Sequence, residues 1–152
     1  MENQAQPAQG RLIPTWRQWL YAAGNFGVTF SPTVVAAWLR YFYTGRENPD
    51  GSPLILVDAG LFGLIWFVCN AANGITDPLV GFLSDRTRSR FGRRKPWVAI
   101  GAPLLAISFF MLWIPPVVDG PALGNAVQLA VALFFFWFFF TVVVAPYLSL
   151  LP

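Results

Sequence analysis

The segment GFLSDRTRSRFGRRKP, residues 81–96, separates two long apolar stretches of the chain. It carries six cationic side chains and a single anionic one. Lys and Arg beside membrane-spanning segments resist translocation, so a cluster of this kind marks the cytoplasmic side of a bilayer. Residues 81–96 therefore predict a short cytoplasmic loop between two segments that cross a membrane.

The composition of the whole chain is also typical of a protein in a bilayer. Charged residues make up 11% of the 152 residues, whereas soluble domains contain about 25%. The net charge is +3, and six of the ten basic residues lie in this one loop, so the basicity indicates topology and we expect no nucleic-acid partner. The chain has no His and only one Cys, which excludes a zinc site of the usual ligands and an internal disulfide. Because no catalytic constellation is present, we predict no catalytic residues, no metal site, no cofactor and no enzyme activity.

Four apolar segments are long enough to span about 30 Å of hydrocarbon, which takes about 20 helical residues. Connections that contain Pro, Gly and Asp separate the first from the second and the third from the fourth. The predicted fold class is an all-α membrane protein with four transmembrane helices. We expect these helices at about residues 19–43, 54–83, 97–118 and 123–151.

The distribution of charge also predicts an orientation. Arg11 and Arg17 precede the first helix and the basic loop follows the second, so both termini are expected to be cytoplasmic. Residues 1–17 are polar and lack the pattern of a signal peptide. We expect them to form a disordered cytoplasmic tail, and residues 18–152 to form the transmembrane bundle of an inner- or plasma-membrane protein.

A carboxylate lies within the second apolar segment. An ionised carboxylate in hydrocarbon costs at least about 2.5 kcal/mol, so Asp77 is expected to face a cavity, a partner or an ion pathway. Asn70, Asn73 and Asp77 stand at i, i+3 and i+7 and share one helical face. Pro78 has no N–H and leaves the carbonyl of Gly74 without its helical partner. These oxygens predict a coupling site for H⁺ or Na⁺; the alternative is a helix–helix contact joined by hydrogen bonds.

Two further polar stretches indicate a cavity for a solute. The first segment contains GNFG at residues 24–27, followed by Thr29, and the last segment contains Pro146 followed by Tyr147. Broken or kinked helices at membrane depth often line the cavities of transporters. We therefore place Asn25, Thr29 and Tyr147 in a substrate cavity, with close helix packing as the alternative.

The residues DPLVG at 77–81 and SDRTRSRFGRRKPW at 84–97 resemble a known signature. It is the helix II to helix III signature of the major facilitator superfamily, and in particular of the glycoside–pentoside–hexuronide:cation symporters, the melibiose permease group. The resemblance extends from about Trp19 to Pro152. It implies helices I–IV of a twelve-helix fold whose substrate site lies between two halves. The expected function is cation-coupled symport of a sugar or a similar small polar solute, and the expected chain is an N-terminal fragment.

In that family the basic loop is a gating element. Asp85 can pair with Arg93 or Arg94 and hold the cytoplasmic helix ends together in one conformation. A loop that only determines topology is the alternative. The gating residues that the resemblance implies are Gly81, Asp85, Arg86, Gly92, Arg93 and Arg94.

The sequence departs from the family pattern at three positions. Asn73 stands where the melibiose-permease group has the first of two helix II carboxylates, and Thr29 and Val144 stand where that group has sugar-binding carboxylates. A galactoside specificity is therefore not carried over. The expected partners are the lipid bilayer, a small polar solute, and the remaining helices of the transporter or another membrane subunit. Two other functions stay open: a small oligomeric four-helix transporter, and a non-transporting membrane subunit or assembly factor.

Overall fold

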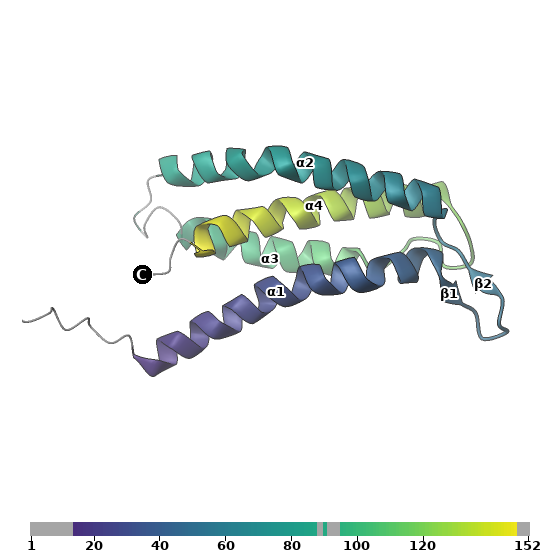
Figure 1. The fold of residues 1–152 in the computed structure, drawn as a ribbon, viewed down its shortest axis with the longest axis horizontal. Coiled ribbons are helices and arrows are strands. Elements are labelled where there is room, and N and C mark those ends of the chain that lie inside the picture. The colour runs from purple at the N-terminus through teal and green to yellow at the C-terminus, as the bar shows by residue number, and fades with distance from the viewer. Residues whose placement is uncertain (1–13, 88–89, 91–94, 149–152) are drawn as a thin grey trace, which may run out of the picture.

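The computed structural model describes residues 14–87, 90 and 95–148. In this part the chain forms four helices and one short hairpin, all aligned along one long axis (Figure 1). We call the end of the bundle with the hairpin the hairpin end, and the opposite end the loop end. The elements are α1 (Thr15–Thr44), β1 (Arg46–Glu47), β2 (Pro53–Leu54), α2 (Ala59–Arg86), α3 (Lys95–Met111) and α4 (Leu123–Leu148), with β1 and β2 antiparallel.

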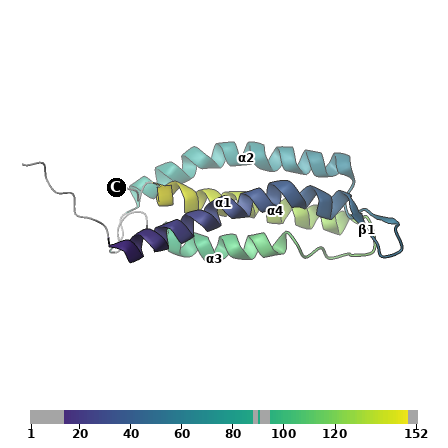
Figure 2. The same ribbon diagram turned by 60° about the horizontal axis from the view of Figure 1, so that its bottom comes forward.

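Helix α4 is the centre of the bundle. Helices α2 and α3 both pack along it, and α4 lies between them in both views (Figures 1 and 2). Helix α1 contributes to the core through its C-terminal half, where Val35, Leu39 and Tyr43 are fully buried. Most of its N-terminal half is exposed. The packed core is therefore concentrated toward the hairpin end.

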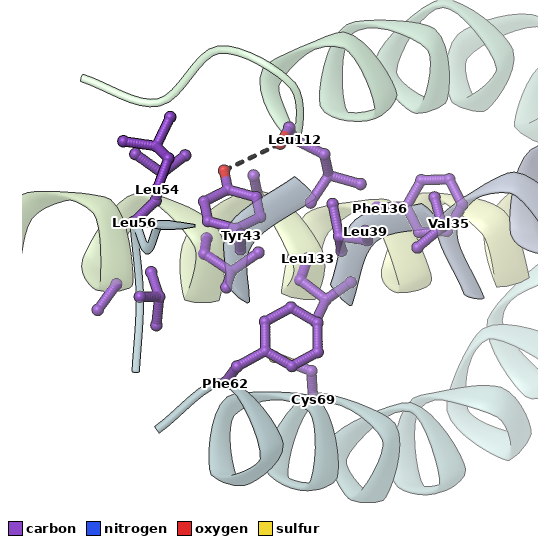
Figure 3. Packing of buried hydrophobic residues seen from close by; sticks show 14 residues of the cluster. Val35, Leu39, Tyr43, Leu54, Leu56, Phe62, Cys69, Leu112, Leu133 and Phe136 are labelled. Carbon is purple, nitrogen blue, oxygen red and sulfur yellow. Dashed lines mark hydrogen bonds between the residues drawn. The ribbon is translucent and has the colours of Figure 1, made fainter. Parts of the chain in front are cut away.

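Polar side chains join the connections at the hairpin end. The hydroxyl of Tyr43 donates to the carbonyl of Leu112 at 2.9 Å (Figure 3). Asn125, fully buried at the start of α4, accepts from the amide of Val117 at 3.0 Å. Its own side-chain amide lies 2.9–3.3 Å from the carbonyl oxygens of Val117, Leu56 and Gly120. One amide thus joins α4 to the connection before it and to the segment before α2.

Several helix ends differ from the sequence-based expectation, by up to seven residues. Helix α3 ends at Met111, seven residues short of 118, because the residue before a proline avoids the helical region and Pro115 follows closely. The chain leaves the helix through tighter bonds such as Trp113 N–H to the Phe110 carbonyl. Helix α1 begins at Thr15, inside the expected tail of residues 1–17, whose first 13 residues lie outside the described part.

Helix α2 begins at Ala59 rather than 54 because Asp58 caps it. A carboxylate oxygen of Asp58 accepts from the amides of Gly60 and Leu61 at 2.9 and 3.2 Å, which satisfies donors that the first helical turn leaves unpaired. The preceding residues pair in the hairpin instead. At the other end of the chain, α4 is described as far as Leu148.

Within the described residues, α2 and α4 are long and apolar enough to cross a membrane, and the apolar part of α3, Pro96–Met111, is shorter. Large apolar side chains are exposed over the bundle, including Phe67 at 70% and Ile75 at 74%. Soluble monomers rarely expose apolar surface on this scale. The fold is thus a helical bundle whose outer surface suits lipid or further helices.

Candidate cation site between helices α2 and α4

Three side-chain oxygens meet where α2 packs on α4. The hydroxyl oxygen of Thr141 lies 2.5 Å from Oδ1 of Asp77 and 3.0 Å from Oδ1 of Asn73. Asn73 and Asp77 are one turn apart on α2, and Thr141 is buried on α4. The same interface continues toward the hairpin end, where the thiol of Cys69 approaches the carbonyl of Ala130. Packing between the two helices therefore sets the distances within this cluster.

The Thr141 hydroxyl lies between two polar side chains of α2. The Thr141 hydroxyl carries a single hydrogen, which is best donated to the Asp77 carboxylate because charge-assisted hydrogen bonds are the stronger kind. The side-chain amide of Asn73 lies within hydrogen-bond distance of the same Thr141 oxygen, at 3.0 Å. Pro78 lies inside α2 and removes the amide that the Gly74 carbonyl would otherwise accept from. Such a group of acceptors, with one formal negative charge, can coordinate a hard cation.

Sequence reasoning predicted part of this cluster. The structure brings Asn73 and Asp77 together but places Asn70 apart, with its side-chain amide donating to the carbonyl of Trp66 at 2.8 Å. Thr141 was missed. Its signal was a hydroxyl directly after the aromatic run of residues 134–140, although only the contact between α2 and α4 shows which residues it meets.

Of the three residues expected in a substrate cavity, Tyr147 reaches the backbone of Asn25, whereas Thr29 lies apart. Tyr147 stacks on Tyr21, with ring centroids 4.6 Å apart, and its hydroxyl donates to the Tyr21 carbonyl. It borders a groove of about 380 Å³ between α1, α3 and α4. Asn25 and Thr29 lie on exposed parts of α1 outside that groove.

Half of the expected gating residues fall in the described part of the loop. Gly81 lies near the end of α2, and its carbonyl accepts from the Ser84 hydroxyl at 2.9 Å. The guanidinium of Arg86 lies 4.4 Å from the centre of the Phe82 ring, and Asp85 is exposed. Trp97 donates to the Thr87 hydroxyl at 3.0 Å and so joins the two sides of the loop. The other half, Gly92, Arg93 and Arg94, lie outside the described residues.

Comparison with known proteins decides the family. The sequence model of the family described as MFS/sugar transport protein matches residues 20–152. The chain belongs to this family. Membership in the MFS/sugar transport family confirms the resemblance to the cation symporters of the major facilitator superfamily and makes the bundle a membrane fold.

Relatives of this MFS family member are named as symporters. The chain is 34% identical over 137 residues to an uncharacterized symporter of Synechocystis, a match of 87% of this chain and 24% of the relative. It is 32% identical over 116 residues to the inner membrane symporter YicJ of Escherichia coli, covering 76% and 23%. It is 36% identical over 124 residues to the sodium-dependent lysophosphatidylcholine symporter 1 of Mus musculus, covering 76% and 22%.

The chain spans about a quarter of the length of these curated relatives. No solved structure gives a significant match. These relatives are named as symporters, which are transporters and not enzymes.

Proposed function

We propose that the chain forms part of a cation-coupled symporter that moves a sugar or a similar small polar solute across an inner or plasma membrane. The oxygen cluster of Asn73, Asp77 and Thr141 carries this proposal. All four helices would cross the bilayer, with both termini cytoplasmic, and transport would require further helices from the same chain or a partner. The family and the symporter names of its relatives support the class of activity.

The cluster would bind the coupling cation between two helices. Carboxylate, amide and hydroxyl oxygens are ligands that hard cations prefer. Because Asp77 and Asn73 come from α2 and Thr141 comes from α4, a bound cation would hold these helices in one relative position. A ligand that binds one conformation better shifts the population toward it, and this is how cation binding would be coupled to solute binding.

Sodium fits the cluster better than a proton does. A proton on the Asp77 carboxylate could form a hydrogen bond between only two of the oxygens. A metal cation could contact all three oxygens at once. The sequence lacks a second helix II carboxylate at Asn73, and the Thr141 oxygen would take its place as a ligand. The coupling ion is therefore proposed to be Na⁺, with H⁺ as the alternative outcome of the test below.

The solute path is proposed from the sequence and from the exposed part of α1. Asn25 and Thr29 are exposed on α1 and could face a solute held between this bundle and further helices. Tyr147 would act at the inner end of that path, where its hydroxyl already joins α4 to α1. The loop residues from Gly81 to Arg94 would gate the cytoplasmic side.

The decisive experiment replaces Asp77 with Asn in the full-length transporter. We expect cation-driven accumulation of solute in membrane vesicles to be lost, with membrane insertion unchanged, since the substitution keeps the shape and removes the charge. Asn70→Ala is the matched control, because Asn70 lies on the same helix outside the cluster. Normal accumulation by Asp77→Asn would reduce Asp77 to a structural residue.

Uptake of a panel of small sugars under a sodium or a proton gradient would identify solute and ion. Accumulation under a sodium gradient alone is expected. Accumulation under a proton gradient alone would instead assign the cluster to proton coupling. A protein that takes up no solute under either gradient but co-purifies with other membrane proteins would contradict the transport function.

A further inference from the structure

A cleft between α1 and α2 at the hairpin end is lined by a positively charged side chain, Arg40, that plays no part in the proposed coupling site. The cleft has a volume of about 400 Å³, and Arg40 is the charged residue in its wall. Helices α1 and α2 are closest at this end and separate toward the loop end (Figure 1). The remaining lining residues are Ala36, Ala59, Phe62, Gly63 and Trp66.

The charge of Arg40 is not neutralised by the part of the chain that the structure describes. Its guanidinium makes no ion pair and no hydrogen bond among these residues. Asp58, the acidic residue that precedes the lining residue Ala59, already accepts two amide hydrogens as the cap of α2. An unpaired guanidinium near the end of an apolar helix is costly unless an anion or water meets it.

The walls of the cleft can accommodate the planar guanidinium of Arg40 together with an amphiphilic ligand. Phe62 and Trp66 stack with centroids 6.1 Å apart and form an aromatic wall on α2. Gly63 and two alanines leave space, and a Cβ atom placed on Gly63 would meet no atom within 4 Å. An oxyanion could therefore approach the guanidinium while an attached apolar chain lies against Trp66 and the exposed apolar side chains of Leu64 and Phe67.

We propose that this cleft binds the phosphate of an anionic membrane lipid through Arg40. Arg40 lies one turn before the end of α1, a depth at which lipid headgroups meet a transmembrane helix. The fork of the guanidinium donates two parallel hydrogen bonds to phosphate oxygens. The bound lipid would fill the cleft between α1 and α2, separate from the oxygen cluster between α2 and α4.

The test counts lipids on the purified full-length protein. Native mass spectrometry in neutral detergent compares phosphatidylglycerol with phosphatidylcholine of the same acyl chains. We expect preferential retention of phosphatidylglycerol and an about tenfold weaker binding in Arg40→Gln, as loss of a hydrogen bond between charged groups predicts. Arg46→Gln is the matched control, because Arg46 lies over the Phe42 ring on the hairpin and outside the cleft.

A second variant tests the cleft without removing the charge. Gly63→Leu places a side chain in the open space beside Arg40 and should also lower phosphatidylglycerol binding. Gly27→Leu, at an equally open position on α1, should not. Equal binding by wild type, Arg40→Gln and Gly63→Leu would overturn the proposal. Binding of soluble glycerol phosphate with the same dependence on Arg40 would overturn the lipid assignment in favour of a soluble anion.

Discussion

At the scale of single residues, Thr141 gives the α2–α4 contact its chemical character. A valine would have nearly the same shape and would leave Asp77 and Asn73 facing an apolar surface. The hydroxyl supplies an oxygen within 3.0 Å of both side chains. The contact between the two helices therefore contains polar side chains that can act as ligands. Their relative positions depend on how α2 and α4 pack together.

Thr141→Val is predicted to weaken binding of the coupling cation, and Thr141→Ser to preserve that binding. Loss of a hydrogen bond to a charged group costs about 1.5–3 kcal/mol, so the half-saturating cation concentration in uptake assays should rise by about tenfold or more. The serine variant keeps the oxygen and should stay within a factor of about two. Equal behaviour of the two variants would show that the hydroxyl is not a ligand.

A second residue-scale prediction concerns the turn between β1 and β2, outside the membrane-spanning segments. The hydroxyl and amide of Ser52 donate to the Asp50 carboxylate at 2.7 and 3.1 Å and lower the pKa of Asp50. Because the folded pKa is depressed, the turn is favoured above the unfolded pKa and loses that support as pH falls through the folded pKa.

Ser52→Ala should therefore raise the pKa of Asp50 toward its ordinary value. An NMR titration of the Asp50 carboxyl carbon measures the change, with Thr44→Ala as a control whose hydroxyl bonds only its own helix. An unchanged pKa in Ser52→Ala would contradict the assigned hydrogen bonds.

At the scale of elements, the sequence predicted the existence and order of the helices better than their ends and contacts. Four apolar segments of sufficient length required four helices, and the first residue of α4 was predicted correctly. The end of α3 was missed because the proline pair acts on residues before it as well as at its own position. The contact between Asp77 and Thr141 joins residues 64 apart, so it depends on the rotation of two helices that one sequence does not encode locally.

The contact between α3 and α4 gives a prediction at this scale. A Cβ atom on Gly101 would lie 2.8 Å from Cγ1 of Val142 and 2.9 Å from Cγ2 of Val143. Gly101→Ala should therefore force these helices apart and lower stability by about 1–3 kcal/mol. Thermal unfolding in detergent measures the loss, and adding Val142→Ala should recover part of it.

Gly27→Ala is the control for that experiment. Its added methyl group would meet no atom within 4 Å, and alanine has the higher helix propensity. Its melting temperature should stay the same or rise. Equal destabilisation by Gly27→Ala and Gly101→Ala would show that the close approach of α3 and α4 is not the cause.

At the scale of the whole molecule, the helices alternate in direction. The start of α1, the end of α2, the start of α3 and the end of α4 all lie at the loop end (Figures 1 and 2). The basic segment, residues 81–96, connects α2 to α3 at this end. If that end is cytoplasmic, the hairpin is on the opposite side of the membrane.

Cysteine labelling tests this orientation. In a Cys69→Ser background, a cysteine at Asp50 should react with an impermeant maleimide added outside intact cells, and a cysteine at Gln4 should react only after permeabilisation. Cys69 is the one native cysteine, so its replacement by serine leaves the introduced cysteine as the one thiol that can react. External labelling of position 4 would invert the proposed topology.

The buried amide of Asn125 has a mechanical consequence for the bundle. Its hydrogen bonds fasten the connections at the hairpin end, so a rigid tilt of α4 about this point would displace the loop end most. Helix α4 has 26 residues and is therefore ~39 Å long. A tilt of ~10° about Asn125 would move its far end by ~7 Å, beside the basic loop.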